Sequence, residues 1–195
     1  MQLESGTMLG SAGYRRPVGL LGGSFSPPHQ GHIHISEVAL RTLDLGKIYW
    51  VYAKQNPLKK VGPSSLRDRL EKTKKLVKNP SIKLSQIEIR NNFHYSFQLL
   101  KFLKRRNSHI KFIWVMGEDN IIKFHHWKNW HWIANNVKIA VIARGSNRSI
   151  VNSSTFAQKY RAFRLRGIQS SQLQQFKPPI SVSYTHLTLP TTYGV

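Results

Sequence analysis

Two histidines three positions apart, His29 and His32, stand in the glycine- and proline-rich stretch GGSFSPPHQGH, residues 22–32. On the first turn of a helix this spacing puts both rings on one side, where each can donate a ring N–H to a phosphate oxygen. Gly22 and Gly23 let a ligand approach the main chain, and the free N–H groups of a helix start favour an anion. The stretch therefore predicts a phosphate-binding turn, with a plain turn carrying solvated histidines as the alternative.

The elements that must position this turn alternate along the chain. Short segments rich in aromatic and β-branched residues predict strands at 16–21, 47–53, 82–89, 111–116 and 138–143. Apolar residues at helical spacing predict helices at 31–43, 64–78, 95–106 and 119–135. This order predicts an α/β fold, a doubly wound parallel sheet covered by helices on both faces. Ligands of such sheets bind at the carboxyl ends of strands, which is where 22–32 and GEDN, residues 117–120, would lie.

The composition excludes several classes of protein. The 195 residues fit one domain, predicted at 17–181 after a loose leader at 1–16. Because the chain has no cysteine, disulfides, thiol nucleophiles and zinc–thiolate sites are excluded, and the two histidines lack the further ligands of a metal site, so no protein-held metal is predicted. No apolar run reaches the roughly 18 to 20 residues of a membrane span or suits an export signal. We therefore expect a cytoplasmic protein without membrane contact.

The charge is strongly positive, with 30 Lys and Arg against 8 Asp and Glu, a formal net charge of +22. Such a field attracts anions, including nucleic acid. The basic residues are spread along the chain, and no aromatic RNA-reading motif accompanies them. We therefore expect a small phosphate compound, rather than nucleic acid, as the main ligand.

Several short motifs carry a resemblance to a known family. GGSFSPPHQGH, with its HxGH histidines, resembles the signature of the nucleotidyltransferase superfamily, and in this form that of the bacterial nicotinate-nucleotide adenylyltransferases. The stretch 55–59 resembles the family's NPxxK segment, 65–70 its RL-containing helix, and 117–120 its GADN loop. Trp127, Trp130 and Ile133 resemble its WxxWxxI helix. These matches run in order from about residue 17 to 145 and imply a Rossmann-like nucleotidyltransferase fold.

The resemblance implies a reaction and its partners. The AMP part of ATP, bound with Mg²⁺, would be joined to nicotinate mononucleotide, giving deamido-NAD and pyrophosphate in NAD biosynthesis. The attacking group is a phosphate oxygen, so catalysis needs positioning and charge stabilisation rather than a protein nucleophile. A related transferase with another phosphate acceptor and a basic nucleic-acid-binding module are the competing hypotheses. The oligomeric state stays open.

The resemblance also implies two groups of site residues, with His29 and His32 as the catalytic pair. The group that would hold ATP comprises Gly22, Gly23, Ser24, Phe25, His29, His32, Gly117 and Asp119. The group that would hold the acceptor nucleotide comprises Lys59, Tyr95, Ser96, Trp127 and Arg144. Trp127 would stack on the nicotinate ring, and filling the core with its aromatic neighbours is the alternative for it. Arg144 could instead be a solvated strand end.

The sequence departs from the family pattern at three places. Ser26 stands where the family usually has Asn, and residues 95–100 read YSFQLL where it usually has YTxDTL. A C-terminal ISSTxIR motif is expected, but residues 180–184 read ISVSY and no basic residue closes the motif. We therefore expect 182–195 to be an atypical, non-native tail, and expect a chain altered there to bind its substrates yet turn over slowly.

Overall fold

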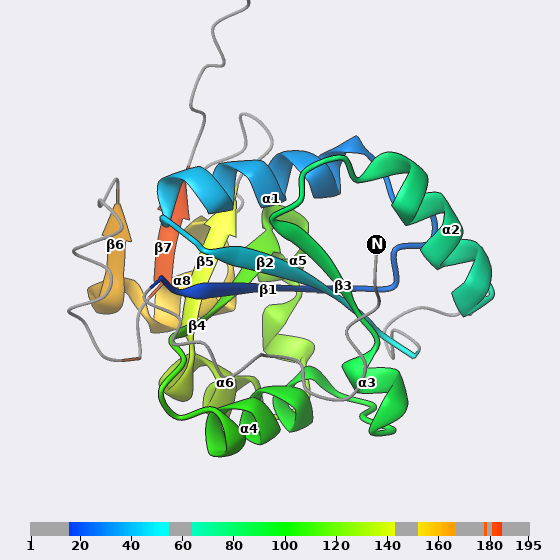
Figure 1. Ribbon diagram of the computed structural model, residues 1–195. Coiled ribbons are helices and arrows are strands. Elements are labelled where there is room, and N and C mark those ends of the chain that lie inside the picture. Colours follow the sequence, from blue (N-terminus) through cyan, green and yellow to red (C-terminus); the bar gives the residue numbers. More distant parts are fainter. Residues whose placement is uncertain (1–15, 55–63, 143–151, 167–177, 179–180, 185–195) are drawn as a thin grey trace, which may run out of the picture.

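A single parallel sheet organises the chain (Figure 1). The computed structural model describes residues 16–54, 64–142, 152–166, 178 and 181–184. The strands, in the order β3-β2-β1-β4-β5-β7-β6, all pair in parallel. Their bounds are β1 Val18–Gly23, β2 Lys47–Tyr52, β3 Ile82–Ser85, β4 Phe112–Gly117, β5 Lys138–Ile142, β6 Arg164–Arg166 and β7 Ser181–Tyr184.

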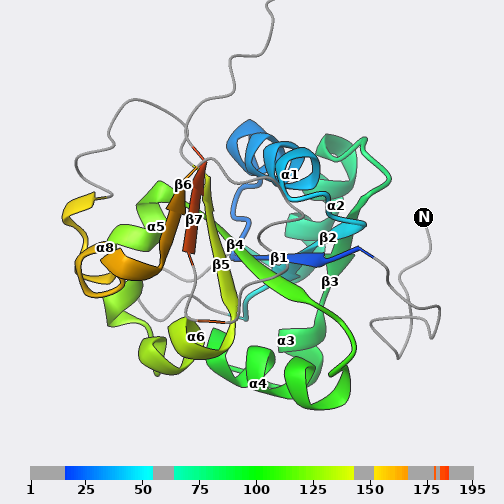
Figure 2. The same ribbon diagram turned by 90° about the vertical axis from the view of Figure 1, so that its left-hand side faces the viewer.

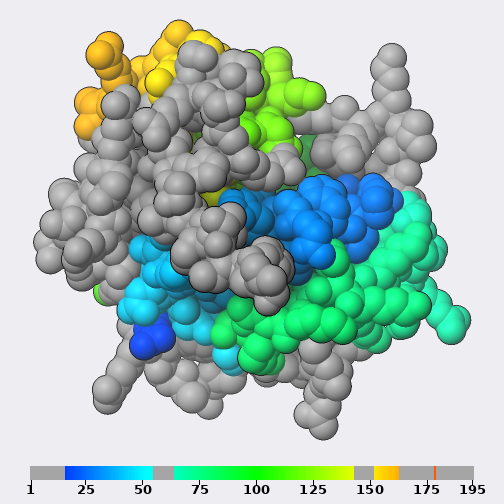
Figure 3. Space-filling model, turned by 90° about the horizontal axis from the view of Figure 1, so that it is seen from above, coloured from blue at the N-terminus to red at the C-terminus, as the bar shows by residue number. Residues whose placement is uncertain are grey.

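Helices cover both faces of this sheet. The helical segments are α1 Gln30–Thr42, α2 Leu66–Leu76, α3 Ile87–Arg90, α4 Ser96–Arg106, α5 Glu118–Ile122, η1 Phe124–His126, α6 Trp130–Asn136, α8 Thr155–Lys159 and η2 Arg161–Phe163. Helices α1 and α2 lie on one face, while α3, α4 and α6 lie on the other (Figures 1 and 2). Seen from above, α1 lies beside α2 (Figure 3).

Each face of the sheet has its own apolar core, because successive strand residues point to opposite faces. In β1, Val18 and Leu20 join the cluster that includes Leu99, Leu100 and Leu103 of α4. Leu21, the next residue, joins the other cluster with the apolar face of α1 and with Leu66 and Leu70 of α2. Strands buried on both faces read as continuous apolar runs, which explains why the sequence shows them as such.

The predicted doubly wound parallel sheet is confirmed, and two predicted elements are corrected. The strand expected over 82–89 ends at Ser85, and Ile87–Arg90 form the single turn α3. The long helix expected over 119–135 is three pieces, α5, η1 and α6. Asn129 takes a left-handed conformation, φ 54°, immediately before α6, and one such residue is enough to end a continuous helix.

Strand β7 lies at the predicted C-terminal limit of the domain, residue 181. Strand β7, Ser181–Tyr184, pairs with β5 on one side and β6 on the other. The boundary expected between 181 and 182 therefore falls inside a strand of the sheet. Residues 1–15 of the predicted leader and the end of the tail at 185–195 lie outside the described residues.

Candidate active site

The site lies where the strand order reverses. From β1 the chain builds outward through β2 and β3 on one side, and from β4 through β5 and β7 on the other. The loops that leave the carboxyl ends of β1 and β4 in opposite directions open a crevice there, the usual ligand site of an open α/β sheet. A pocket of about 320 Å³ occupies this position, with residues 21–27 from the first loop and Gly117, Asp119 and Asn120 from the second in its wall.

The pocket brings together both groups of predicted site residues. Those that lie in the described ranges all line it: Gly22, Gly23, Ser24, Phe25, His29, His32, Tyr95, Ser96, Gly117, Asp119 and Trp127. Lys59 and Arg144 lie outside the described residues. Segments as far apart in the chain as Gly22 and Trp127 thus share one cavity. What each residue does there stays a prediction.

His29 and His32 form a reciprocal cap at the start of α1. The Nδ1 atom of His29 accepts a hydrogen bond from the backbone N–H of Gly31 at 3.1 Å, and that of His32 accepts from the N–H of His29 at 3.3 Å. The two ring centroids are 3.9 Å apart. Because Nδ1 accepts in both rings, each neutral imidazole carries its proton on Nε2. In these tautomers the hydrogen-bond donor of each ring is Nε2–H, a group from which a phosphate oxygen can accept.

Phe25 anchors the loop that carries these histidines. Its backbone is left-handed, φ 48°, which is strained for an aromatic residue. The side chain is 1% exposed and stacks on Trp50, with ring centroids 4.8 Å apart. It also meets His32 edge-on at 5.0 Å. Burial of this ring offsets the strain of the turn and anchors the loop against Trp50 of β2.

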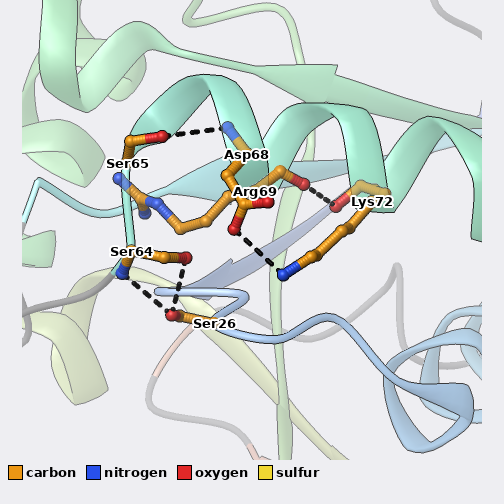
Figure 4. Close-up of polar contacts among 7 residues, drawn as sticks. Ser26, Ser64, Ser65, Asp68, Arg69 and Lys72 are labelled. Atoms are coloured by element: carbon orange, nitrogen blue, oxygen red, sulfur yellow. Dashed lines mark hydrogen bonds and ion pairs between the residues drawn. The ribbon is translucent and has the colours of Figure 1, made fainter.

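Serine hydroxyls tie the same loop to α2 (Figure 4). The Ser26 hydroxyl lies 3.1 Å from that of Ser64 and accepts a hydrogen bond from the Ser64 backbone N–H. Ser65 caps α2 by accepting from the N–H of Asp68 at 3.1 Å. A hydrogen bond from Lys72 lowers the pKa of Asp68. The start of α2 and the first loop therefore form one connected unit.

Arg69 joins the ends of two strands from inside that unit. Its side chain is 3% exposed, and Nη1 donates to the carbonyl oxygens of Ser24 at 2.8 Å and Ala53 at 3.0 Å. The guanidinium also lies over the ring of Tyr52 at 5.8 Å. The Tyr52 hydroxyl donates to Thr73 of α2, and burial raises the pKa of Tyr52 to about 12. One cation thus fixes the segments that follow β1 and β2.

Close contacts explain two glycines of the site. A Cβ on Gly22 would lie 2.5 Å from Cη2 of Trp114, whose fully buried indole meets Trp127 edge-on with ring centroids 6.1 Å apart. A Cβ on Gly117 would lie 2.6 Å from Oδ1 of Asp119. Larger residues at these positions would displace Trp114 or the Asp119 carboxylate. Trp127 is half-buried and also packs against the apolar core, so both roles predicted for it are compatible with its position.

Other pocket residues were missed by sequence reasoning. They are Leu21, Ser26, Pro27, Ile35, Ala53, Glu88, His94, Asn120, His126 and Lys128. Glu88 was expected within the strand predicted at 82–89. The signal that could have marked it as a site residue was its carboxylate, which stands alone in an alternating apolar run. Burial raises the pKa of Glu88 to about 8. His126 is exposed at the pocket wall.

Comparison with known proteins identifies the family. The cytidylyltransferase-like family model matches residues 20–184. A relative from Ruegeria sp. (strain TM1040), named "Probable nicotinate-nucleotide adenylyltransferase", is 38% identical over 175 residues, 90% of this chain and 91% of its own. A relative of the same name from Agrobacterium fabrum is 40% identical over 163 residues, 83% of this chain and 87% of its own. This chain belongs to the nicotinate-nucleotide adenylyltransferase family.

Solved structures agree on the fold. Plasmodium falciparum nicotinic acid mononucleotide adenylyltransferase complexed with NaAD aligns with a TM-score of 0.64 at 18% identity, covering 89% of this chain and 77% of its own. The same enzyme complexed with APC gives a TM-score of 0.62 at 17% identity, covering 89% and 76%. The sheet therefore has the Rossmann-like nucleotidyltransferase architecture that the motifs predicted. Among the described residues, no helix is both long and apolar enough to cross a membrane.

Proposed function

We propose that this chain transfers the adenylyl group of ATP to nicotinate mononucleotide, giving deamido-NAD and pyrophosphate in NAD biosynthesis. The observation that carries the proposal is the single pocket at the strand-order reversal, in which the HxGH histidines, the GEDN loop and Trp127 meet. The relatives that are 38% and 40% identical over most of their length carry the name of this activity. A cytoplasmic location, where ATP is available, is part of the proposal.

The reaction needs one bond to form and one to break. An oxygen of the acceptor's phosphate attacks the α-phosphorus of ATP, and the bond from that phosphorus to the bridging oxygen breaks, so that pyrophosphate leaves with the electron pair. The attacking oxygen is already ionised near neutral pH, and no protein base has to remove a proton. His29 and His32 would donate their Nε2–H groups to the phosphate oxygens on which negative charge increases.

Mg²⁺ enters this scheme as part of the substrate, bound to ATP. Within the described ranges, no group of three or more His, Asp or Glu side chains could hold a metal ion. Mg²⁺ on a nucleotide is held mainly by phosphate oxygens and water, often with one or two carboxylates. Asp119, in the first turn of α5, lines the pocket. Rather than hold Mg²⁺, its carboxylate would accept hydrogen bonds from the ribose hydroxyls of the adenylate.

The acceptor would occupy the part of the pocket lined by Tyr95, Ser96 and Trp127. An indole face suits a flat pyridine ring, and a hydroxyl suits its carboxylate. Lys59 and Arg144, expected as phosphate contacts, complete the proposed acceptor group. Nucleic acid is not proposed as a partner, because the described site fits a nucleotide-sized ligand.

The test is pyrophosphate release from ATP and Mg²⁺, measured with nicotinate mononucleotide and with the nicotinamide form. We expect release that depends on the nicotinate nucleotide and falls about 10²- to 10³-fold in His32→Ala, the loss typical of removing one donor to developing charge. His34→Ala is the matched control, because His34 lies on α1 but does not line the pocket.

Two results would contradict the proposal. One is ATP-dependent release that another phosphate acceptor supports better than nicotinate mononucleotide does. The other is the absence of ATP binding by calorimetry in the full-length chain. Full activity would in addition show that the altered C-terminal segment is tolerated.

A further inference from the structure

Glu88 is a buried acid in the wall of the active-site pocket. It lies on α3, the single turn that follows β3, and is 4% exposed. The pocket wall around it includes Ala53, His94, Tyr95 and Ser96, the part that would receive the acceptor nucleotide. The reaction as proposed does not use this carboxyl group.

The hydrogen bonding of Glu88 is incomplete. Its Oε1 atom is fully buried and has no hydrogen-bond partner among the described residues. A buried polar atom left unpaired costs about 1 to 3 kcal/mol, so such atoms usually have a structural or functional reason. Glu88 also lines the pocket, so a bound ligand can supply a hydrogen-bond partner to the part of the carboxyl group that faces the cavity.

Burial also decides the protonation state of Glu88. Desolvation raises its pKa to about 8, so near neutral pH the side chain is mainly a carboxylic acid with an O–H to donate. Helix α3 contacts β2 and α4. The titratable groups on these elements and their ends, and across the pocket, are Arg90, Lys47, Tyr49, Tyr52, Lys54, His94, Tyr95, Lys101, Lys104, Arg105, Arg106, His29, His32, Asp119, His126 and Lys128.

At residues 95–100 this chain lacks the acid and the threonine that the family usually has, so another residue would have to contact a ligand there. Gln98, which stands where the family usually has an acid, is occupied at the start of α4: its Oε1 accepts from the backbone N–H groups of His94 and Tyr95 at 2.9 and 3.1 Å. Leu99, which replaces the threonine, is fully buried. Neither residue offers a hydroxyl or acid to a ligand, whereas Glu88 does.

We propose that Glu88 is a specificity-determining residue which, as a neutral acid, donates its O–H to the carboxylate of the nicotinate ring; this rests on the proposed function. An O–H···O⁻ bond between two carboxyl groups that share one proton is short and strong. An ionised Glu88 would repel the same ligand. Binding of the nicotinate nucleotide therefore requires the protonated form, while the uncharged nicotinamide group meets no such repulsion.

The test compares the wild-type chain with Glu88→Gln, which keeps an N–H donor and cannot ionise. With a pKa of about 8, the neutral fraction falls from about nine-tenths at pH 7 to about one-tenth at pH 9. The KM for nicotinate mononucleotide should therefore rise about tenfold more in wild type than in Glu88→Gln over that range. Over the same pH range, the KM for ATP should change to the same extent in wild type and in Glu88→Gln. All other titratable groups are shared, so the difference between the two profiles belongs to Glu88.

Glu37→Gln, an exposed acid on α1 outside the pocket wall, is the matched control and should follow wild type. Parallel KM profiles for wild type and Glu88→Gln would overturn the inference, as would a difference confined to ATP. Calorimetric binding of nicotinate mononucleotide at both pH values separates the two proposals. If wild type forms no deamido-NAD, the proposed function fails. Separately, if the dissociation constant of wild type for nicotinate mononucleotide is the same at both pH values, the inference about Glu88 fails.

Discussion

Replacing Arg69 by Met should loosen the first loop without emptying the space that the arginine fills. The guanidinium is 3% exposed and its Nη1 donates to the carbonyl oxygens of Ser24 and Ala53, the residues that follow β1 and β2. Methionine has a similar length and no donor. The substitution therefore removes both hydrogen bonds and leaves the packing nearly intact.

The expected loss follows from these contacts. A hydrogen bond from a charged donor contributes about 1.5 to 3 kcal/mol. The full sum for two bonds is reduced, because Ser24 and Ala53 line the pocket, where water can reach their carbonyls, and because Nε of Arg69 is buried without a partner. We expect the free energy of unfolding to fall by about 2 to 4 kcal/mol, which for a chain of this size lowers Tm by roughly 5 to 15 °C.

Urea denaturation of the full-length chain measures this loss, and steady-state kinetics measures its consequence for the loop. KM for ATP should rise more than kcat falls, since the displaced carbonyl belongs to the segment that approaches the nucleotide. Arg69→Lys is the control: it keeps the charge but has no planar fork to reach two acceptors, so it should recover only part of the stability. A Met variant within about 0.5 kcal/mol of wild type, with unchanged KM for ATP, would refute the reasoning.

Three further substitutions test other contacts. Gly22→Ala should destabilise the chain by about 1 to 3 kcal/mol in urea, because its Cβ meets the buried Trp114 ring; a cost under about 0.5 kcal/mol would contradict this. Ser65→Ala should cost about 1 kcal/mol by removing the cap on Asp68, and an unchanged urea midpoint would count against it. The pKa of Glu88 is about 8 in the folded chain and near 4.3 in the unfolded chain, so the folded state binds this proton more tightly. The resulting stability is fully present below about pH 4.3 and is lost as the pH rises through about 8. Across that window wild type should therefore lose up to about 5 kcal/mol relative to Glu88→Gln. Parallel stability curves of the two proteins in thermal melts would exclude it.

Much of the fold was predictable because it follows from short-range patterns. Apolar strand runs and the helical spacing over 31–43 depend on neighbours in the chain, and the structure reproduces them. The long helix expected over 119–135 was wrong because the left-handed conformation of Asn129 interrupts it, and asparagine can adopt either the helical or the left-handed conformation, so its identity alone does not predict the break. The seventh strand pairs with β5 and β6, contacts that no local pattern shows.

The site was predictable only as far as its motifs reach. His29 and His32 share one short stretch, so their proximity follows from the sequence. Arg69 and Glu88 act through tertiary position: one is a basic residue on a basic helix, the other an acid in an alternating run, and neither looks unusual until burial is known. Long-range packing gives both of them their chemistry.

The order of the strands explains why residues so far apart in the chain converge on one pocket. Ser24 and Ala53 follow neighbouring parallel strands, so one donor on α2 can hold both carbonyls. Trp114, in the strand on the other side of β1, packs tightly against Gly22 and meets Trp127 edge-on. The first loop is thus held from α2 on one side and from β4 on the other. A substitution on either side should therefore affect the nucleotide and the acceptor parts of the pocket together, because both parts share the segment that follows β1.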